Sequence, residues 1–321
     1  MNRVLITGGA GFIGSNLADR LLADGKEVVV YDNFTTGHRK FVEGVEAHPK
    51  GEVFEDDVLD GERLGEALAG VDTVFHLAAN ADVRHGLEQP LRDLEQNTVA
   101  TSALLEVMRE AGVTRLGFAS SGSVYGEPDV VPTPEDAPFP IQTSLYGASK
   151  AAGEGMLQAY CHGYGFTGVV FRFVSILGAR YTHGHVIDFY RALKRDPTQL
   201  QVLGDGRQEK SYLYVGDCVS AMLTAMAAHT QPGETGVYNI GTDETVVVDE
   251  SMALIAAHLG VAPAVTHTGG RRGWPGDTPL ILLDCAKLRG LGWAPTLSIE
   301  EAIGRTLDWL DDNSELVQEV R

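Results

Sequence analysis

The stretch T-G-G-A-G-F-I-G at residues 7–14 constrains the fold of this chain more than any other feature. It follows the apolar run VLI and precedes a segment with helical periodicity, so Gly8, Gly11 and Gly14 stand where a strand turns into a helix. Glycines at these places let the chain turn, let the backbone approach a pyrophosphate at the helix N-terminus, and let helix and strand pack closely. The stretch predicts a dinucleotide-binding βαβ unit, with a plain tight turn as the alternative.

Apolar runs of strand length alternate with amphipathic helical stretches from Arg3 to about Leu116. Such alternation is typical of βαβ units in a parallel sheet with helices on both faces. After about residue 170 the sequence changes to shorter helices and glycine- and proline-punctuated loops. We therefore predict an α/β fold with a Rossmann-type doubly wound sheet. We expect an NAD-binding domain at residues 1–170 and a smaller substrate domain at residues 171–321, with some chain crossing back.

Charge and cysteine content narrow the class of protein. The 321 residues have a formal net charge of -19, which disfavours nucleic acid and anionic membranes as partners because the field repels phosphate. No run approaches the roughly 20 apolar residues that span a bilayer, and the N-terminus lacks a secretory signal pattern, so we expect a cytoplasmic protein. Cys161, Cys218 and Cys285 lie far apart without a CxxC pair, so neither disulfides nor a structural metal site is expected.

Asp32 ends the second predicted strand, EVVVYD, 18 residues after Gly14. A carboxylate at this place accepts hydrogen bonds from the adenosine ribose and repels a 2′-phosphate, which favours NAD over NADP. His38 and Arg39 follow closely and keep NADP open as the weaker alternative. A solvated aspartate at the start of a turn is the alternative without a cofactor.

Two segments suggest catalysis: ASSGSVYG, with Ser121 and Ser123, and SLYGASK, with Tyr146 and Lys150. Tyr146 and Lys150 are four residues apart at the start of a predicted helix, so their side chains leave one helix face. A free phenol has a pKa of about 10, and a base at neutral pH needs that pKa lowered by about three units. The Lys150 ammonium and an oxidised nicotinamide are the available positive charges. Ser121 ends a neighbouring strand and can hydrogen-bond the same substrate oxygen.

Together, GGAGFIG, FHLAA, SSGSVYG, YGASK and SYLYVGD resemble the extended short-chain dehydrogenase/reductase family, and most of all its nucleotide-sugar epimerases of the UDP-glucose 4-epimerase type. The resemblance runs from Val4 to about Trp309 and implies NAD as cofactor, a UDP-sugar as substrate and a homodimer. It implies that Tyr146 is the base, that Lys150 binds the nicotinamide ribose and that Ser121 holds the sugar hydroxyl. The implied cofactor contacts are Gly8, Gly11, Phe12, Ile13, Gly14, Asp32, Asn33, Asp57, Val58, Leu77, Ala78, Ala79, Asn97, Tyr146 and Lys150.

The substrate contacts that the resemblance implies depart from the family pattern in two places. Ser175 stands where these epimerases often carry asparagine, and Arg272 is displaced from the usual arginine position, so we expect Arg272, Lys210 and Gln208 to reach the diphosphate. A lysine is a point charge rather than a bidentate fork, which predicts somewhat looser diphosphate binding. The full set of expected substrate contacts is Ser121, Ser123, Tyr146, Ser175, Gln208, Lys210, Tyr212, Arg272 and Asp277.

The two residues after Ser121 discriminate among the reactions of this family. Related 4,6-dehydratases carry Asp-Glu there, an acid and a base that remove water, whereas this chain has Gly122 and Ser123. We therefore expect an isomerase, a 4-epimerase of UDP-glucose and UDP-galactose or their N-acetyl forms that takes hydride from C4 and returns it. The alternatives are a dehydratase or dehydrogenase on the same scaffold, an epimerase of another nucleotide sugar such as a UDP-uronic acid, and a non-catalytic NAD-binding protein.

Overall fold

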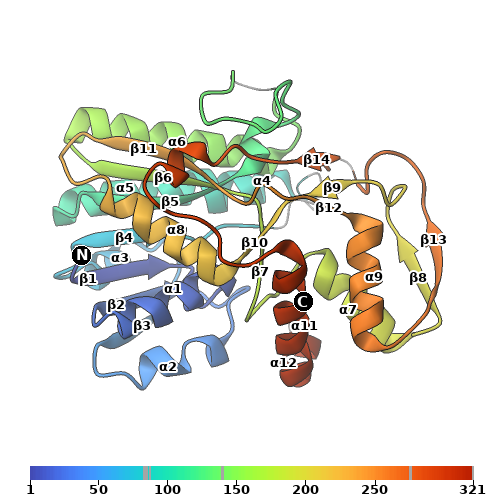
Figure 1. Ribbon diagram of the computed structural model, residues 1–321. Coiled ribbons are helices and arrows are strands. Elements are labelled where there is room, and N and C mark those ends of the chain that lie inside the picture. Colours follow the sequence, from blue (N-terminus) through green and yellow to red (C-terminus); the bar gives the residue numbers. More distant parts are fainter. Residues whose placement is uncertain (82–85, 87, 139–140, 275–276, 320–321) are drawn as a thin grey trace.

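A seven-stranded parallel sheet forms the centre of the computed structural model (Figure 1), which describes residues 1–81, 86, 88–138, 141–274 and 277–319. The strand order is β11-β6-β5-β4-β1-β2-β3, with every neighbouring pair parallel. The order reverses between β1 and β4, and such a switch point is where α/β proteins bind ligands. The strands of this sheet are β1 Arg3–Thr7, β2 Glu27–Asp32, β3 Gly51–Glu55, β4 Thr73–His76, β5 Arg115–Ser121, β6 Thr167–Phe173 and β11 Thr235–Ile240.

Helices cover both faces of this sheet because its strands carry apolar side chains on both sides. In β1, Val4 and Ile6 belong to one apolar core, whereas Leu5 between them belongs to the other. α1 and α8 pack together over the first core, and α3, α5 and α6 cover the second (Figure 1). The predicted doubly wound Rossmann-type fold is therefore confirmed. These helices are α1 Phe12–Ala23, α3 Gly61–Ala67, α5 Ala100–Ala111, α6 Leu145–Tyr164 and α8 Val215–Ala227, with the short α2 at Glu43–Glu46.

A continuous but irregular helix spans residues 90–111. It begins as α4, Pro90–Asp93, winds as a π-helix over Leu94–Val99 and continues as α5. It ends before Gly112, whose φ of 72° is the left-handed conformation that favours glycine. A π turn inside an α-helix often marks a functional site, and this one contains Asn97.

Most of the chain after β6 forms a smaller lobe beside the carboxyl edge of the sheet, at the right of Figure 1. Three later elements belong to the main sheet instead: β11 pairs with β6, α8 packs with α1 over one face, and the short α10, Ala286–Arg289, contacts β11. The lobe is built from short strands and helices. Its elements are β7 Ser175–Leu177, α7 His185–Arg195, β8 Gln199–Val202, β9 Glu209–Lys210, β10 Tyr212–Tyr214, β12 Val246–Val247, α9 Val248–Leu259, β13 Ala264–His267, β14 Leu280–Ile281, α11 Ile299–Asp312 and α12 Ser314–Glu319.

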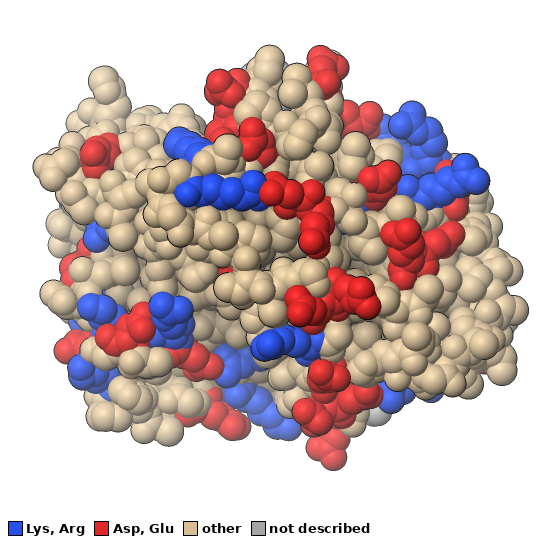
Figure 2. Space-filling model, in the orientation of Figure 1, with Lys and Arg blue, Asp and Glu red and all other residues tan. Residues whose placement is uncertain are grey.

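Charged side chains of both signs lie on the surface, whereas the three thiols lie inside. On the face shown in Figure 2, Lys and Arg side chains lie scattered among acidic ones. Cys161, Cys218 and Cys285 are buried free thiols. Across the described ranges, no helix is both long and apolar enough to cross a bilayer, and no group of three or more side chains is arranged to hold a metal ion.

Candidate active site

The turn from β1 into α1 is so tight that only glycine fits at two positions, one in the loop and one in the first turn of the helix. Gly8 has a φ of 68°, and a Cβ there would lie 2.6 Å from a main-chain nitrogen after β4. A Cβ on Gly14 would lie 2.2 Å from the Gly8 carbonyl oxygen. Gly11 caps α1, and Phe12 and Ile13 form its first turn, where backbone N–H groups lack intrahelical partners and favour an anion. This cradle fits the pyrophosphate of a dinucleotide.

Asp32 ends β2 and faces this loop. Its Oδ2 accepts a hydrogen bond from the Ala10 amide at 2.9 Å, and its Oδ1 accepts one from the Phe34 amide at 2.8 Å. Burial raises the pKa of the carboxyl, while the two backbone hydrogen bonds lower it. The buried position rules out the solvated aspartate considered from the sequence. Arg39, the candidate partner of a 2′-phosphate, pairs with Glu55 instead.

The other predicted cofactor contacts follow β2, β3 and β4. Asn33 Nδ2 donates to Asp57 Oδ2 at 2.8 Å and thereby links the loops after β2 and β3, and Val58 is buried. Residues 77–79 come directly after β4, where the Leu77 amide donates to the Thr7 carbonyl at 3.0 Å. The structure thus gathers these residues at the carboxyl edge of the sheet, around the switch point.

Asn97 links the loop after β4 to helix α6. Its Oδ1 accepts from the Asn80 amide at 2.8 Å, and its Nδ2 donates to the Asn80 carbonyl at 3.3 Å. The same Nδ2 donates to Ser149 Oγ at 2.9 Å. Because Ser149 directly precedes Lys150, these contacts hold the start of α6 against the cofactor edge of the sheet.

The structure brings Ser121, Tyr146 and Lys150 together. Ser121 is the last residue of β5, and the other two lie in the first turns of α6. The Ser121 hydroxyl accepts from the Ser123 amide at 3.1 Å and hydrogen-bonds the Tyr146 phenol. Lys150 Nζ lies 5.9 Å from the centre of the Tyr146 ring. A substrate hydroxyl at this edge can therefore contact the serine and the phenol at once.

Burial dominates the electrostatics of this group. It raises the pKa of the Tyr146 phenol to about 12, although the hydrogen bond with Ser121 lowers it, and the charge of Asp93 raises it further. Burial also lowers the pKa of the Lys150 ammonium to about 8, while Asp93 and Glu154 raise it. Lys150 alone therefore does not produce the low phenol pKa that a base at neutral pH needs, because desolvation has the larger effect.

The cations predicted to meet a diphosphate already contact carboxylates. Lys210 Nζ pairs with Asp277 Oδ1 at 2.7 Å, and both side chains are buried. Arg272 Nη1 donates to the Asp277 carbonyl at 2.8 Å, and its Nη2 pairs with Glu127. Gln208 is buried close by in the chain. The structure brings these groups together and gives both cations carboxylate partners that the sequence did not predict.

Ser175 and Tyr212 are neighbours in the β7–β10 ladder. Ser175 is exposed, whereas Tyr212 is buried and its hydroxyl contacts His185 Nδ1 at 2.8 Å. The other ring nitrogen of His185 contacts Ser251 Oγ at 2.6 Å. Sequence reasoning missed this chain of contacts because its members come from three separate elements and no local pattern connects them.

Sequence reasoning also missed three charged residues near the group, two of them buried and Arg172 partly buried. Asp93 lies in α4, Glu154 in α6 and Arg172 in β6. Two of them carried a usable signal: Glu154 follows Lys150 by four residues on the same helix, and Arg172 interrupts the apolar strand TGVVFRF. Asp93 had no such signal within its polar surroundings.

A parallel sheet with a glycine cradle at its switch point, an acidic residue ending the second strand and a Ser-Tyr-Lys group at its carboxyl edge defines a dinucleotide-dependent enzyme of the extended short-chain dehydrogenase/reductase class. Comparison with known sequences specifies the family. The chain belongs to the NAD dependent epimerase/dehydratase family, whose sequence model matches residues 4–241. The resemblance stated from the motifs is confirmed, and the cofactor is NAD.

Individual relatives span the whole chain. The UDP-glucose 4-epimerase of Mycolicibacterium smegmatis is 34% identical over 320 residues, covering 98% of this chain and 100% of that protein. The structure of a Thermus thermophilus UDP-glucose 4-epimerase in complex with NAD matches with a TM-score of 0.85 and 36% identity, over 97% of this chain and 99% of that one. The dTDP-glucose 4,6-dehydratase DesIV of Streptomyces venezuelae, with NAD bound, matches with a TM-score of 0.89 and 28% identity, over 99% and 100%.

Proposed function

We propose that this chain is a 4-epimerase of a UDP-hexose, acting on UDP-glucose and UDP-galactose or on their N-acetyl forms. The observation that carries the proposal is the pair of residues after Ser121. Gly122 packs so closely that a Cβ would lie 3.3 Å from the Phe173 carbonyl oxygen, and Ser123 is a hydroxyl, not an acid. Removal of water needs a positioned acid and base, and neither residue supplies a carboxylate.

In this proposal Tyr146 takes the proton from the sugar's C4 hydroxyl, and Ser121 holds that oxygen by a hydrogen bond. Lys150 binds the nicotinamide ribose, and its ammonium adds to the positive charge that stabilises the phenolate. When bound, NAD supplies the oxidant that accepts hydride from C4 and returns it. Rotation of the 4-keto sugar within the site between the two hydride transfers presents its opposite face and so inverts C4.

The contacts to the cofactor and the substrate are part of the proposal. We assign NAD to the cradle of Gly8, Gly11 and Gly14, to Asp32, and to the loops after β3 and β4. We assign the nucleotide sugar to the lobe after residue 171, which excludes α8, β11 and α10, with its diphosphate at Gln208, Lys210 and Arg272. An incoming diphosphate then competes with Asp277 and Glu127 for the two cations, which supports the looser binding expected from the sequence. The proposal includes a cytoplasmic homodimer.

The test is to incubate the protein with UDP-glucose and, separately, with UDP-N-acetylglucosamine, while proton NMR follows the anomeric signals and absorbance follows reduced nicotinamide. Appearance of the galacto epimer without accumulating NADH supports the proposal. A dehydratase is the second candidate, because DesIV shares the fold over the whole chain. Loss of water from the product would favour it, and stoichiometric NADH would favour a dehydrogenase.

A variant isolates the role of the phenol. Tyr146→Phe should lower kcat by at least about 10²-fold, the lower range for a general base, while NAD remains bound. Tyr164→Phe, at the exposed end of the same helix, should keep the wild-type rate. Equal rates for wild type and Tyr146→Phe would contradict the mechanism.

A further inference from the structure

A largely buried ion pair, with an arginine side chain 14% exposed, lies beside the Ser-Tyr-Lys group, and the mechanism above does not use it. Arg172 of β6 and Glu154 of α6 form a two-pronged contact, with Nε to Oε1 at 3.0 Å and Nη2 to Oε2 at 2.7 Å. Glu154 is 5% exposed. Such planar bidentate contacts fix orientation as well as distance.

The sheet register places this pair directly behind the catalytic serine. Ser120 pairs with Arg172 in the parallel β5–β6 ladder, so both side chains leave the same face of the sheet. Ser120 Oγ also donates to Glu154 Oε1. Glu154 thus contacts the residue that immediately precedes Ser121.

Helix periodicity connects the same carboxylate to the base. Glu154 follows Lys150 by four residues and Tyr146 by eight, so the three side chains lie along one side of α6. One carboxylate therefore ties the helix that carries Tyr146 and Lys150 to the strand that carries Ser121.

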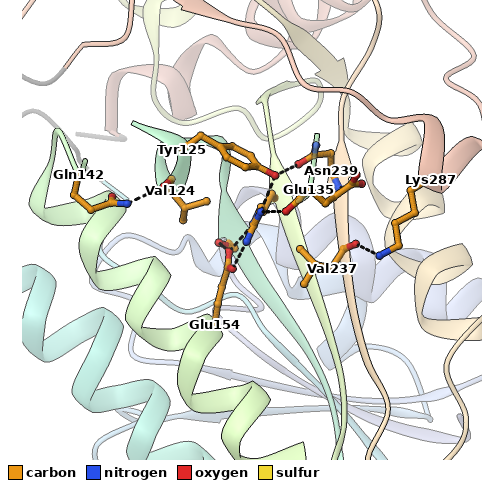
Figure 3. A network of polar contacts seen from close by, with 10 residues as sticks. Val124, Tyr125, Glu135, Gln142, Glu154, Val237, Asn239 and Lys287 are labelled. Carbon is orange, nitrogen blue, oxygen red and sulfur yellow. Dashed lines mark hydrogen bonds and ion pairs between the residues drawn. The ribbon is translucent and has the colours of Figure 1, made fainter. Parts of the chain in front are cut away.

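The remaining guanidinium nitrogen of Arg172 extends the network to the loop after β5. Nη1 donates to the Tyr125 hydroxyl at 2.7 Å and to the Glu135 carbonyl at 3.0 Å. The Tyr125 hydroxyl in turn donates to Asn239 Oδ1 at 2.8 Å. Figure 3 shows Tyr125, Glu135, Glu154 and Asn239 pointing toward one another from α6, from the loop after β5 and from β11.

We propose that Arg172 and Glu154 are a positioning pair, which sets the spacing between the Ser121 hydroxyl and the Tyr146 phenol and supports the ammonium charge of Lys150. This inference rests on the proposed roles of those three residues. A purely stabilising role is a weaker account, because replacing a buried ion pair by apolar residues is often neutral or stabilising. What the pair supplies is a fixed distance between one strand and one helix, at the place where the reaction needs it.

The charges around Lys150 make the electrostatic half of the proposal measurable. The carboxylates of Asp93 and Glu154 raise the pKa of Lys150 against the lowering effect of burial. His76 is uncharged near neutral pH, because burial and the ammonium lower its pKa to about 3, and the Tyr146 phenol is neutral with a pKa of about 12. Loss of one carboxylate therefore lowers the pKa of Lys150.

The kinetic test compares arginine variants under conditions where each is folded, verified by circular dichroism and NAD titration. Arg172→Lys keeps the charge but not the fork, and we expect kcat to fall about 10- to 100-fold with KM within about threefold of wild type. Arg115→Lys is the matched control. Arg115 also lies on a strand of this sheet and donates to main-chain carbonyls, but it is the first residue of β5, at the end opposite Ser121. Its kcat should stay within about twofold of wild type.

Two outcomes would overturn the positioning role. One is a wild-type kcat in Arg172→Lys, even if its melting temperature falls. The other is an equal loss of kcat in Arg115→Lys, which would mean general loosening of the sheet. If Arg172→Lys does not fold, Glu154→Gln replaces it with the same expectation for kcat, because the amide keeps the shape but not the charge of the carboxylate.

A readout without turnover separates this inference from the proposed function. NMR of protein labelled at the lysine Cε, with Lys150 assigned by its absence in Lys150→Met, reports the pKa of the ammonium. Glu154→Gln should lower that pKa by about one unit, and Arg115→Lys should leave it unchanged. If wild type epimerises no sugar but this shift appears, the proposed function fails while the charge support of Lys150 stands. If the pKa of Lys150 is the same in Glu154→Gln as in wild type, the inference is overturned whatever the activity.

Discussion

Replacement of Gly14 by alanine tests whether the cradle after β1 holds NAD. The added Cβ would lie 2.2 Å from the Gly8 carbonyl oxygen, whereas ordinary van der Waals contact begins at 3.4 Å. The N-terminus of α1 must therefore move by about 1 Å away from the loop, which costs about 1–3 kcal/mol as overpacking. The same movement displaces the N–H groups that face the pyrophosphate.

We expect two measurable results from Gly14→Ala. The free energy of unfolding without cofactor, from urea denaturation, should fall by about 1–3 kcal/mol. The Kd for NAD, from calorimetric titration, should rise about 10- to 100-fold, because a loss of about 1.4 kcal/mol is tenfold in affinity.

Gly155→Ala is the matched control. Gly155 lies on the exposed side of α6, and nothing lies within 4 Å of the position its Cβ would take. Alanine there should stabilise the helix by about 0.5–1 kcal/mol and leave NAD affinity unchanged. If Gly14→Ala binds NAD within about threefold of wild type at unchanged stability, the steric account of the cradle is wrong.

Three further predictions concern other buried carboxylates and the buried lysine. Asp32→Asn should reduce the preference for NAD over NADP by at least about tenfold, because the charge that repels a 2′-phosphate is lost; an unchanged ratio of the two Kd values would contradict this. Burial lowers the pKa of Lys150 from its ordinary value of 10.5 to about 8 in the folded protein, so below pH 8 the folded state carries the full cost of a buried ammonium. Between pH 8 and 10.5 the unfolded state binds more protons than the folded state. As the pH rises through this window, the free energy of unfolding of wild type without cofactor should therefore increase by up to about 3 kcal/mol relative to that of Lys150→Met, measured in parallel urea denaturations. A constant difference between the two proteins across this window would refute the assignment. Asp217 accepts hydrogen bonds from the Thr296 amide at 3.0 Å and from the Thr296 hydroxyl at 2.7 Å. Asp217→Ala should therefore lower the free energy of unfolding by about 1–3 kcal/mol. As a control, replacement of the exposed Asp308 by alanine should change the free energy of unfolding by less than about 0.5 kcal/mol.

The fold could be predicted because its signals are local. The glycine stretch, the strand EVVVYD and the helix start YGASK each carry their meaning within a few residues, and the structure places all three as expected. Apolar runs alternating with helical periods indicate a parallel sheet covered on both faces, since both faces of such strands must be buried. The π turn at residues 94–99 was not predicted, because it depends on packing between this helix and α6.

The polar partners at the site could not be predicted, because they come from distant parts of the chain. Lys210 meets Asp277 across 67 residues, and Arg272 meets Glu127 across 145. Contacts of this kind cannot be predicted from the periodicity or the spacing of residues in the sequence. The same holds for Arg172, whose presence in an apolar strand signalled a partner without saying which one.

The sequence by itself determined which chemical groups the protein has: a glycine cradle, a carboxylate after the second strand, and a serine, a tyrosine and a lysine at the ends of strand and helix. These follow from backbone geometry and side-chain type, which act over a few residues. Only the tertiary structure decided how those groups behave. Burial sets the pKa of Tyr146 and Lys150, and the pairing of β5 with β6 puts the Arg172–Glu154 contact behind Ser121. Desolvation and long-range hydrogen bonds depend on where the whole chain lies, and no short stretch of sequence contains that information.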